Sequence, residues 1–397
     1  MKKIALLLSS FFIFTSVIHA QEVIENPEKP LSKKAGRIVQ LKEIHRITDE
    51  GGKYFFKRPY NFQVAPNGDL FVQDREQLLQ FDSKGNFIRN LYKNGQGPGE
   101  MTSITGYHLT KEEVIIYCDS PSKILKYDYD GNITKEMPIY QKKRFNIFEF
   151  YYDKRYYFFH VDWKQLDRFE GVIGLPYELL SLSNNGETLK ELMTFPTRSV
   201  IAVKGGIRGG YVPVDRLISV PWKKKYLVIS HTEEYLLALF DAESQQIVRR
   251  FKRKYPRIKA TEKNDKRPNL SITWDDKTFQ APKRNYLYDI EQLWANDGFL
   301  WVLTSTKEEE KGYAVDVFDI YGVYIDMFFL KLPKEATEDY FGFFQMGVSG
   351  EFFYATEKDE DDNYVIKKYR ILDGNMPTPG TQISKILASI GLRKNAE

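Results

Sequence analysis

The sequence predicts an all-β protein that folds as a single six-bladed β-propeller. Three observations carry this prediction: a unit of short strands recurs six times, tight-turn residues separate the strands, and no convincing long amphipathic helix interrupts them. A propeller sets such four-stranded antiparallel sheets around an axis, which keeps the exposed sheet edges short.

The clearest unit runs from Phe62 to Ile88 and is interpreted as four strands joined by short connections. Asn67-Gly68 and Lys84-Gly85-Asn86 supply the residues that tolerate the positive φ angles of short hairpins. The runs between the turns are short and rich in β-branched and aromatic residues, which favours strands over helices.

Similar units follow along the chain. Together the six span Phe62–Ile88, Val114–Asn132, Tyr156–Gly186, Tyr226–Asp241, Asp297–Gly322 and Gly350–Tyr369. The last unit stops after its third strand, whereas a spare strand, Gly36–Ile44, precedes the first unit. We expect this N-terminal strand to complete the last blade and close the ring. An open solenoid is the alternative, but it needs capping repeats and explains neither the missing strand nor the spare one.

The N-terminus has the pattern of a secretory signal peptide. Lys2 and Lys3 precede an apolar run, Ile4–Ile18, which is followed by Ile18-His19-Ala20 as a cleavage signal. An uncleaved membrane anchor is the alternative, although the run is shorter than the roughly 20 residues that span a bilayer. No cysteine stands directly after the run, where a lipid would be attached. We therefore expect a periplasmic or secreted protein rather than a lipoprotein. The mature chain then comprises a flexible segment (21–35), the propeller (36–372, with an insert at 253–285) and a C-terminal tail (373–397).

Composition narrows the possible partners. Hydrophobic residues make up 42% of the chain and aromatic residues 15%, enough for a large core without the disulfides that a single cysteine cannot form. A net charge of +4 over 397 residues is too weak to indicate nucleic acid as a partner. We expect a monomer with no transmembrane segment after signal removal and with no cofactor.

Several motifs resemble a known group of proteins. These are the Phe/Tyr-Asp-x-x-Gly turns, the Gly-x-Leu-aromatic-Val strand and the run Gly95–Glu100 after the first blade. They resemble the NHL-like propellers, and more closely the exported "6-bladed beta-propeller" proteins of Bacteroidota and related bacteria. The resemblance covers nearly the whole mature chain and implies the fold. It does not imply one activity, because NHL-type propellers include binding modules, lactonases and lyases.

All long connections are predicted to lie on one face of the propeller. Within a blade the strands alternate in direction, so second-to-third turns and blade-to-blade connections share a face. The long segments Val161–Pro176, Thr197–Arg216 and Arg253–Arg284 all belong to that set. They carry the candidate binding residues Trp163, Arg208, Tyr255, Arg257 and Trp274.

The segment Arg253–Arg284 is strongly basic, with ten Lys and Arg residues against four Asp and Glu residues. We therefore expect a non-enzymatic scaffold that engages a protein, peptide or glycan through this loop-rich face. The alternative for the segment is a solvated cover over the blade edge.

The known catalytic and metal-binding motifs are missing or incomplete. Gly95–Gly99 lacks the Gly-Lys-Ser/Thr of a phosphate loop, and Asp359–Asn363 lacks the glycine and glutamate of a calcium loop. His108, His160 and His231 fall in three consecutive blades, His108 on a first strand and the others at the ends of second strands. The alternative function is a metal-assisted hydrolase or lyase that recruits histidines with Asp74 and Asp119 at the channel mouth.

Overall fold

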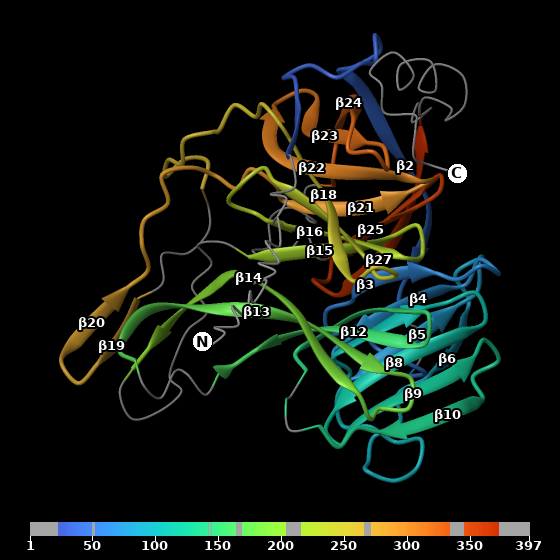
Figure 1. Ribbon diagram of the computed structural model, residues 1–397. Helices are drawn as coiled ribbons and strands as arrows, with labels where there is room; N and C mark the ends of the chain where they lie inside the picture. Colours follow the sequence, from blue (N-terminus) through green and yellow to red (C-terminus); the bar gives the residue numbers. More distant parts are fainter. Residues whose placement is uncertain are drawn as a thin grey trace, which may run out of the picture.

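The structure is a computed structural model that describes residues 23–49, 52–141, 143, 145–163, 169–203, 216–265, 271–333 and 345–372. Almost all regular structure in these residues is β-strand, arranged in small antiparallel sheets (Figure 1). The predicted signal peptide and C-terminal tail lie outside the described residues. The predicted all-β propeller fold is confirmed.

Each blade is a four-stranded sheet. Blades one to three comprise β3 (Tyr60–Val64), β4 (Leu70–Asp74), β5 (Gln77–Phe81) and β6 (Phe87–Asn90); β7 (Gly106–Leu109), β8 (Glu113–Asp119), β9 (Ser122–Asp128) and β10 (Ile133–Pro138); and β11 (Ile147–Tyr152), β12 (Arg155–Val161), β13 (Gly171–Ser183) and β14 (Leu189–Ala202). Blades four to six comprise β15 (Leu217–Trp222), β16 (Tyr226–His231), β17 (Leu237–Asp241) and β18 (Gln246–Arg253); β21 (Gln292–Asn296), β22 (Phe299–Glu308), β23 (Gly312–Phe318) and β24 (Tyr324–Leu330); and β25 (Met346–Ser349), β26 (Phe352–Lys358), β27 (Tyr364–Leu372) and β2 (Arg37–Ile47). A hairpin, β19 (Ser271–Trp274) and β20 (Lys277–Gln280), lies outside the blades, and β1 (Val23–Asn26) joins blade four.

The six blades form a closed ring. Each inner strand contacts the inner strands of both neighbouring blades, in the order β3, β7, β11, β15, β21, β25 and back to β3. Six apolar clusters lie between the blades, each drawing side chains from two neighbours and the last joining blade six to blade one. The core is therefore a series of layers between radial sheets rather than one central mass.

This arrangement explains the apolar runs of the second strands. In β8, Val114 and Ile116 pack toward blade one, whereas Ile115 and Tyr117 pack toward blade three. Successive side chains on a strand point to opposite faces, and both faces of a blade are buried. The strand is therefore apolar at almost every position instead of alternating between apolar and polar residues.

The predicted N-terminal closing strand is present. Residues Gln40–Ile47 of β2 pair antiparallel with β27, so β2 is the outer strand of blade six. Its first residues, Arg37–Val39, also pair in parallel with β24 and join blades five and six into one eight-stranded sheet. Ring closure thus uses hydrogen bonds as well as apolar contact.

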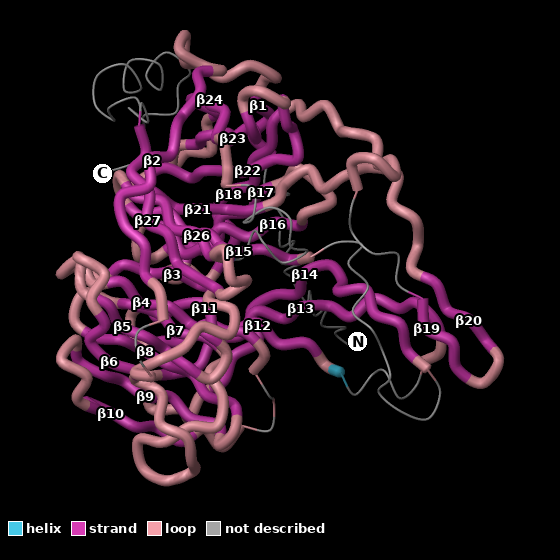
Figure 2. The backbone as a smooth tube through the Cα atoms, turned by 180° about the vertical axis from the view of Figure 1, so that it is seen from behind, coloured by secondary structure: helices cyan, strands magenta, loops and turns pink. Residues whose placement is uncertain are grey.

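A second N-terminal strand adds to this closure. Part of the segment 21–35, expected from the sequence to be flexible, is strand β1, which pairs in parallel with β18 of blade four (Figure 2). The side chain of Asn26 at its end is buried and bridges blades four and five. Its amide donates to the carbonyls of Lys252 at 3.0 Å and Gly322 at 2.9 Å, and it accepts the Tyr324 amide at 2.9 Å.

Across the part of the chain that the structure describes, no helix has the length and apolar character required to span a membrane.

Deleting residues 36–46 should open the ring and make the protein aggregate. The deletion removes β2 and leaves the edges of β24 and β27 unpaired, and exposed edges template intermolecular pairing. We expect a lower melting temperature and soluble aggregates in size-exclusion chromatography with light scattering. The control is Ile44→Ser, which changes a 42% exposed side chain and retains the strand. A deletion variant that stays monomeric and melts like the parent would contradict the closure.

Candidate functional site

The loop-rich face carries two protruding elements. Strands β13 and β14 extend beyond the end of β12 at Val161, and their outer part, Gly171–Pro176 paired with Thr197–Ala202, is called here the arm. The sequence predicted a loop as far as Pro176, because two glycines and a proline break the strand pattern; the structure has β13 there. Hairpin β19–β20 lies beside the arm (Figure 1).

Apolar and charged contacts join the arm to the hairpin. Ile201 of the arm and Ala281 are buried, and Ile272 and Phe279 of the hairpin pack against them. The Nζ atom of Lys277 lies 3.0 Å from a carboxylate oxygen of Glu170. Blades three and four therefore share an ordered projection on this face.

The insert between blades four and five is braced along its length. Its two sides pair through backbone hydrogen bonds between Ala260 and Asn285 and between Leu287 and Ile258. Beyond this pairing, the guanidinium of Arg284 binds the two carboxylate oxygens of Asp265 at 2.9 and 3.0 Å. Such two-point arginine–carboxylate pairs fix geometry as well as charge.

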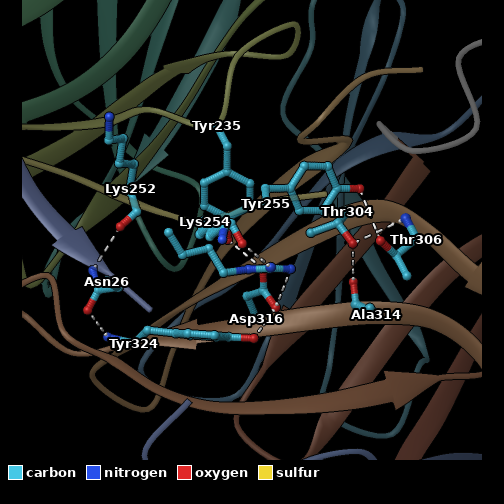
Figure 3. Close-up of polar contacts among 11 residues, drawn as sticks. Asn26, Tyr235, Lys252, Lys254, Tyr255, Thr304, Thr306, Ala314, Asp316 and Tyr324 are labelled. Atoms are coloured by element: carbon cyan, nitrogen blue, oxygen red, sulfur yellow. Dashed lines mark hydrogen bonds and ion pairs between the residues drawn. The ribbon is translucent and has the colours of Figure 1, made fainter. Parts of the chain in front are cut away.

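A buried ion pair anchors the root of the insert. Arg253, the last residue of β18, donates from Nε to Asp316 of β23 at 2.6 Å. Asp316 is fully buried and also accepts the hydroxyls of Tyr235 at 2.6 Å and Tyr324 at 2.7 Å (Figure 3). Asp316 is thus fully hydrogen-bonded, as a buried charge needs to be.

The tyrosines also surround the cation. The guanidinium carbon of Arg253 lies 4.9 to 5.3 Å from the ring centres of Tyr235, Tyr255 and Tyr324. Burial, and then the Asp316 carboxylate, raise the pKa values of Tyr235 and Tyr324, so both hydroxyls remain protonated donors. Burial alone would lower the pKa of Arg253, but Asp316 together with Tyr235 and Tyr324 outweighs burial, and the pKa is raised.

The structure separates the five predicted binding residues. Tyr255 packs on Arg253, and its hydroxyl lies 3.1 Å from that of Thr306. Its ring therefore helps to stabilise the ion pair at the root of the insert. Arg257 binds Asp289 at 2.9 Å and the carbonyl of Glu233 at 2.7 Å. Trp163 is half-buried against the apolar layer between blades three and four. The remaining two are not placed in detail: Arg208 lies outside the described residues, and so does the side chain of Trp274 in β19.

Four lysines of the insert have a different environment from its arginines. They are exposed and have no carboxylate partner among the residues that the structure describes: Lys254, Lys259, Lys263 and Lys283. Residue type accounts for much of this difference, because arginine is favoured in fixed two-point pairs whereas lysine is strongly hydrated, although Lys277 of the same insert pairs with Glu170.

The polar ring at the ends of the second strands is occupied by local hydrogen bonds. It consists of Asp74, Asp119, His160, Ser230, Thr304 and Thr356. Asp74 accepts the amides of Lys57 at 2.7 Å and Arg58 at 2.8 Å, and Thr356 donates to the carbonyl of Pro59 at 2.7 Å. Ser230 and Thr304 likewise donate to backbone carbonyls. These side chains hold the adjoining backbone.

The histidines lie on the strands that the sequence predicted, His108 on first strand β7 and the other two on second strands β12 and β16. Among the described residues there is no group of three or more His, Cys, Asp or Glu side chains placed to hold a metal ion. Burial lowers the pKa of His108 to about 4, so its imidazole is neutral at physiological pH.

One carboxyl group on the inner strands has a shifted pKa that the sequence did not indicate. Glu149 of β11 is half-buried and accepts the Ser219 hydroxyl of β15 at 2.6 Å. Burial raises its pKa to about 7, and the hydrogen bond from Ser219 offsets part of that rise.

Comparison with known proteins identifies the fold. Residues 54–203 match the 6-bladed beta-propeller family DUF5128. The resemblance predicted from the turn and strand motifs is thereby confirmed for this part of the chain. The more distant similarity to NHL-type propellers stays a prediction.

Solved structures agree with the fold over most of the chain. A Bacteroides fragilis protein predicted to be exported is 11% identical, with a TM-score of 0.51, covering 88% of this chain and 99% of its own. A DUF4221 family member from Bacteroides vulgatus is 12% identical, with a TM-score of 0.50, covering 85% of this chain and 99% of its own. At these identities the likeness concerns the fold alone. No curated protein matches the sequence.

Replacing Arg253 by Met should destabilise the protein by about 3–5 kcal/mol, because Asp316 is left as a buried carboxylate without its cation. Adding Asp316→Leu in the same chain should restore much of that loss. Denaturant unfolding of both single variants and the double variant measures the coupling. Additive effects in the double variant would contradict the role given to this pair.

Glu149→Gln should stabilise the protein above pH 7 and have little effect near pH 4. Between the unfolded pKa of about 4.5 and the folded value of about 7, the folded parent binds more protons, so its stability falls as pH rises. The variant lacks this loss, which is about 3 kcal/mol at most. The lowered pKa of His108 makes stability rise with pH instead. Because His108 is present in both the parent and the variant, its contribution cancels in the comparison. Equal pH profiles of unfolding free energy would contradict the assignment.

Proposed function

We propose that this propeller is a non-enzymatic binding scaffold of the cell envelope, which engages a protein, peptide or glycan through its loop-rich face. The observation that carries the proposal is the one-sided elaboration of blades three to five. The arm and the insert with its hairpin β19–β20 rise from that face, whereas the first-to-second turns on the opposite face are short. Elaboration confined to one face of a repeat fold is typical of a binding surface.

The chemistry of the surface favours an acidic partner. The three arginines of the insert that the structure describes, Arg253, Arg257 and Arg284, are committed to internal carboxylates. The four exposed lysines have no such pairing, so their charge is available to a partner. Tyr255, Trp163, Trp274 and Arg208 stay proposed contacts for the partner.

The cell-envelope location rests on two supports. The N-terminal pattern of Lys2, Lys3 and an apolar run predicts export. A Bacteroides fragilis protein of the same fold is itself predicted to be exported.

Replacing Lys254, Lys259, Lys263 and Lys283 together by Gln should weaken binding to acidic ligands without changing the fold. We expect the variant to elute from heparin and polyglutamate columns at a clearly lower salt concentration than the parent, because fewer charges contact the matrix. Its melting temperature should stay within about 2 °C of the parent's, because exposed lysines contribute little stability.

The opposite face supplies a charge-matched control. Lys111, Lys154, Lys223 and Lys224 are exposed on its short turns, and their replacement by Gln removes the same charge. This control should elute like the parent. Equal loss of retention in both quadruple variants would show that the protein binds through its net charge. It would contradict the proposal that the loop-rich face is the binding surface.

A further inference from the structure

The inner strand of blade three carries a bulge at a charged residue. Phe148 and Phe150 of β11 oppose consecutive residues, Phe158 and Tyr157, of β12, so Glu149 is the extra residue between them. A bulge re-aims the side chain that it carries, and bulges are frequent beside functional sites. Here the side chain crosses to inner strand β15 of the next blade, where the Ser219 hydroxyl donates to its Oε2 atom.

Several other half-buried or buried carboxylates are paired with cations, whereas Glu149, like Glu291, accepts only a serine hydroxyl among the described residues. The carboxylates of Glu136, Glu113, Glu357, Asp289 and Asp316 each lie within 3.1 Å of a lysine or arginine nitrogen. Glu149 has no cationic partner, and its Oε1 atom has no hydrogen-bond donor among the described residues.

The elements packed against β11 do not supply a counter-charge. Strand β7 presents His108, whose ring lies 6.4–6.5 Å from those of Phe148 and Phe150 and which is neutral. Strand β15 has no titratable side chain. Strand β12 has Arg155 at one end, paired with Asp153, and His160 near the other.

The inner strands surround the axis of the ring, and Glu149 lies on one of them as a half-buried residue. A carboxylate in such a place loses hydration without gaining a cation, and this cost is relieved either by protonation or by a cation from outside the chain.

We propose that Glu149 and Ser219 form a binding site in the central channel for the protonated amine of a small ligand. Oε1 accepts a charge-assisted hydrogen bond from the ammonium group, while Ser219 holds Oε2. The aliphatic part of the ligand lies along the inner strands. This site is independent of the loop-rich face and of the acidic partner proposed for it.

The test uses n-butylammonium as the probe and n-butanol as its uncharged match. Calorimetry of the full mature chain should show saturable binding of n-butylammonium at pH 8 and about tenfold weaker binding at pH 6, because the carboxylate is then mostly protonated. In the ¹³C spectrum, saturating probe should lower the pKa of the Glu149 carboxyl group by one unit or more.

Three variants separate this site from general attraction to the protein. Glu149→Gln should abolish binding and its pH dependence while the fold is retained, since the amide is isosteric and neutral. Ser219→Ala should weaken binding at pH 7, because loss of the hydroxyl raises the Glu149 pKa further. Glu112→Gln, at an exposed acid on the β7–β8 turn, should bind like the parent.

Equal binding by the parent and Glu149→Gln would overturn the proposal, and so would equal binding of n-butanol or an unchanged Glu149 pKa at saturating probe. The quadruple lysine variant should bind the probe like the parent. The channel site and the proposed function of the loop-rich face therefore fail or succeed separately.

Discussion

Every blade of this molecule must bury both of its faces against a neighbour, and the rest of the structure follows from that constraint. A blade at the end of an open row would expose an aromatic face the size of a full sheet, which soluble monomers rarely do. The ring removes both ends at once. The constraint also decides where charge is tolerated. Second strands such as β8 and β12 are apolar nearly throughout, and a charge inside a blade, such as Asp316 of β23, is paired with a cation.

The parts of the fold that were predictable from the sequence are those encoded locally. Turn pairs such as Asn67-Gly68 specify hairpins over a few residues, and the count of strands alone required an N-terminal strand for the last blade. The arm was missed because Gly171, Gly174 and Pro176 are residues that normally end strands. Their neighbours Val172, Ile173 and Leu175 nevertheless pair with β14.

The candidate sites were less predictable because they depend on distant contacts. Asn26 contacts residues that lie 226 and 296 positions away, and nothing near it in the sequence marks a buried amide. Phe148-Glu149-Phe150 has the pattern of an ordinary alternating strand, in which the glutamate would face solvent. Only the register against β12 reveals the bulge. The basic insert was recognised as a whole, but its division into committed arginines and exposed lysines requires the positions of their carboxylate partners.

The pairing of the N-terminal strands has a consequence for how the chain is made. Synthesis delivers β1 and β2 first, yet the partner of β2 in blade six follows more than about 300 residues later. Contacts so remote in sequence fold slowly, because loop closure costs entropy before any bond forms. Until the last blade is present, the ring is open, and one apolar face of blade one and one of blade five stay exposed. Exposed apolar faces and unpaired strand edges favour aggregation, so an incomplete propeller of this design is at risk until β27 pairs with β2.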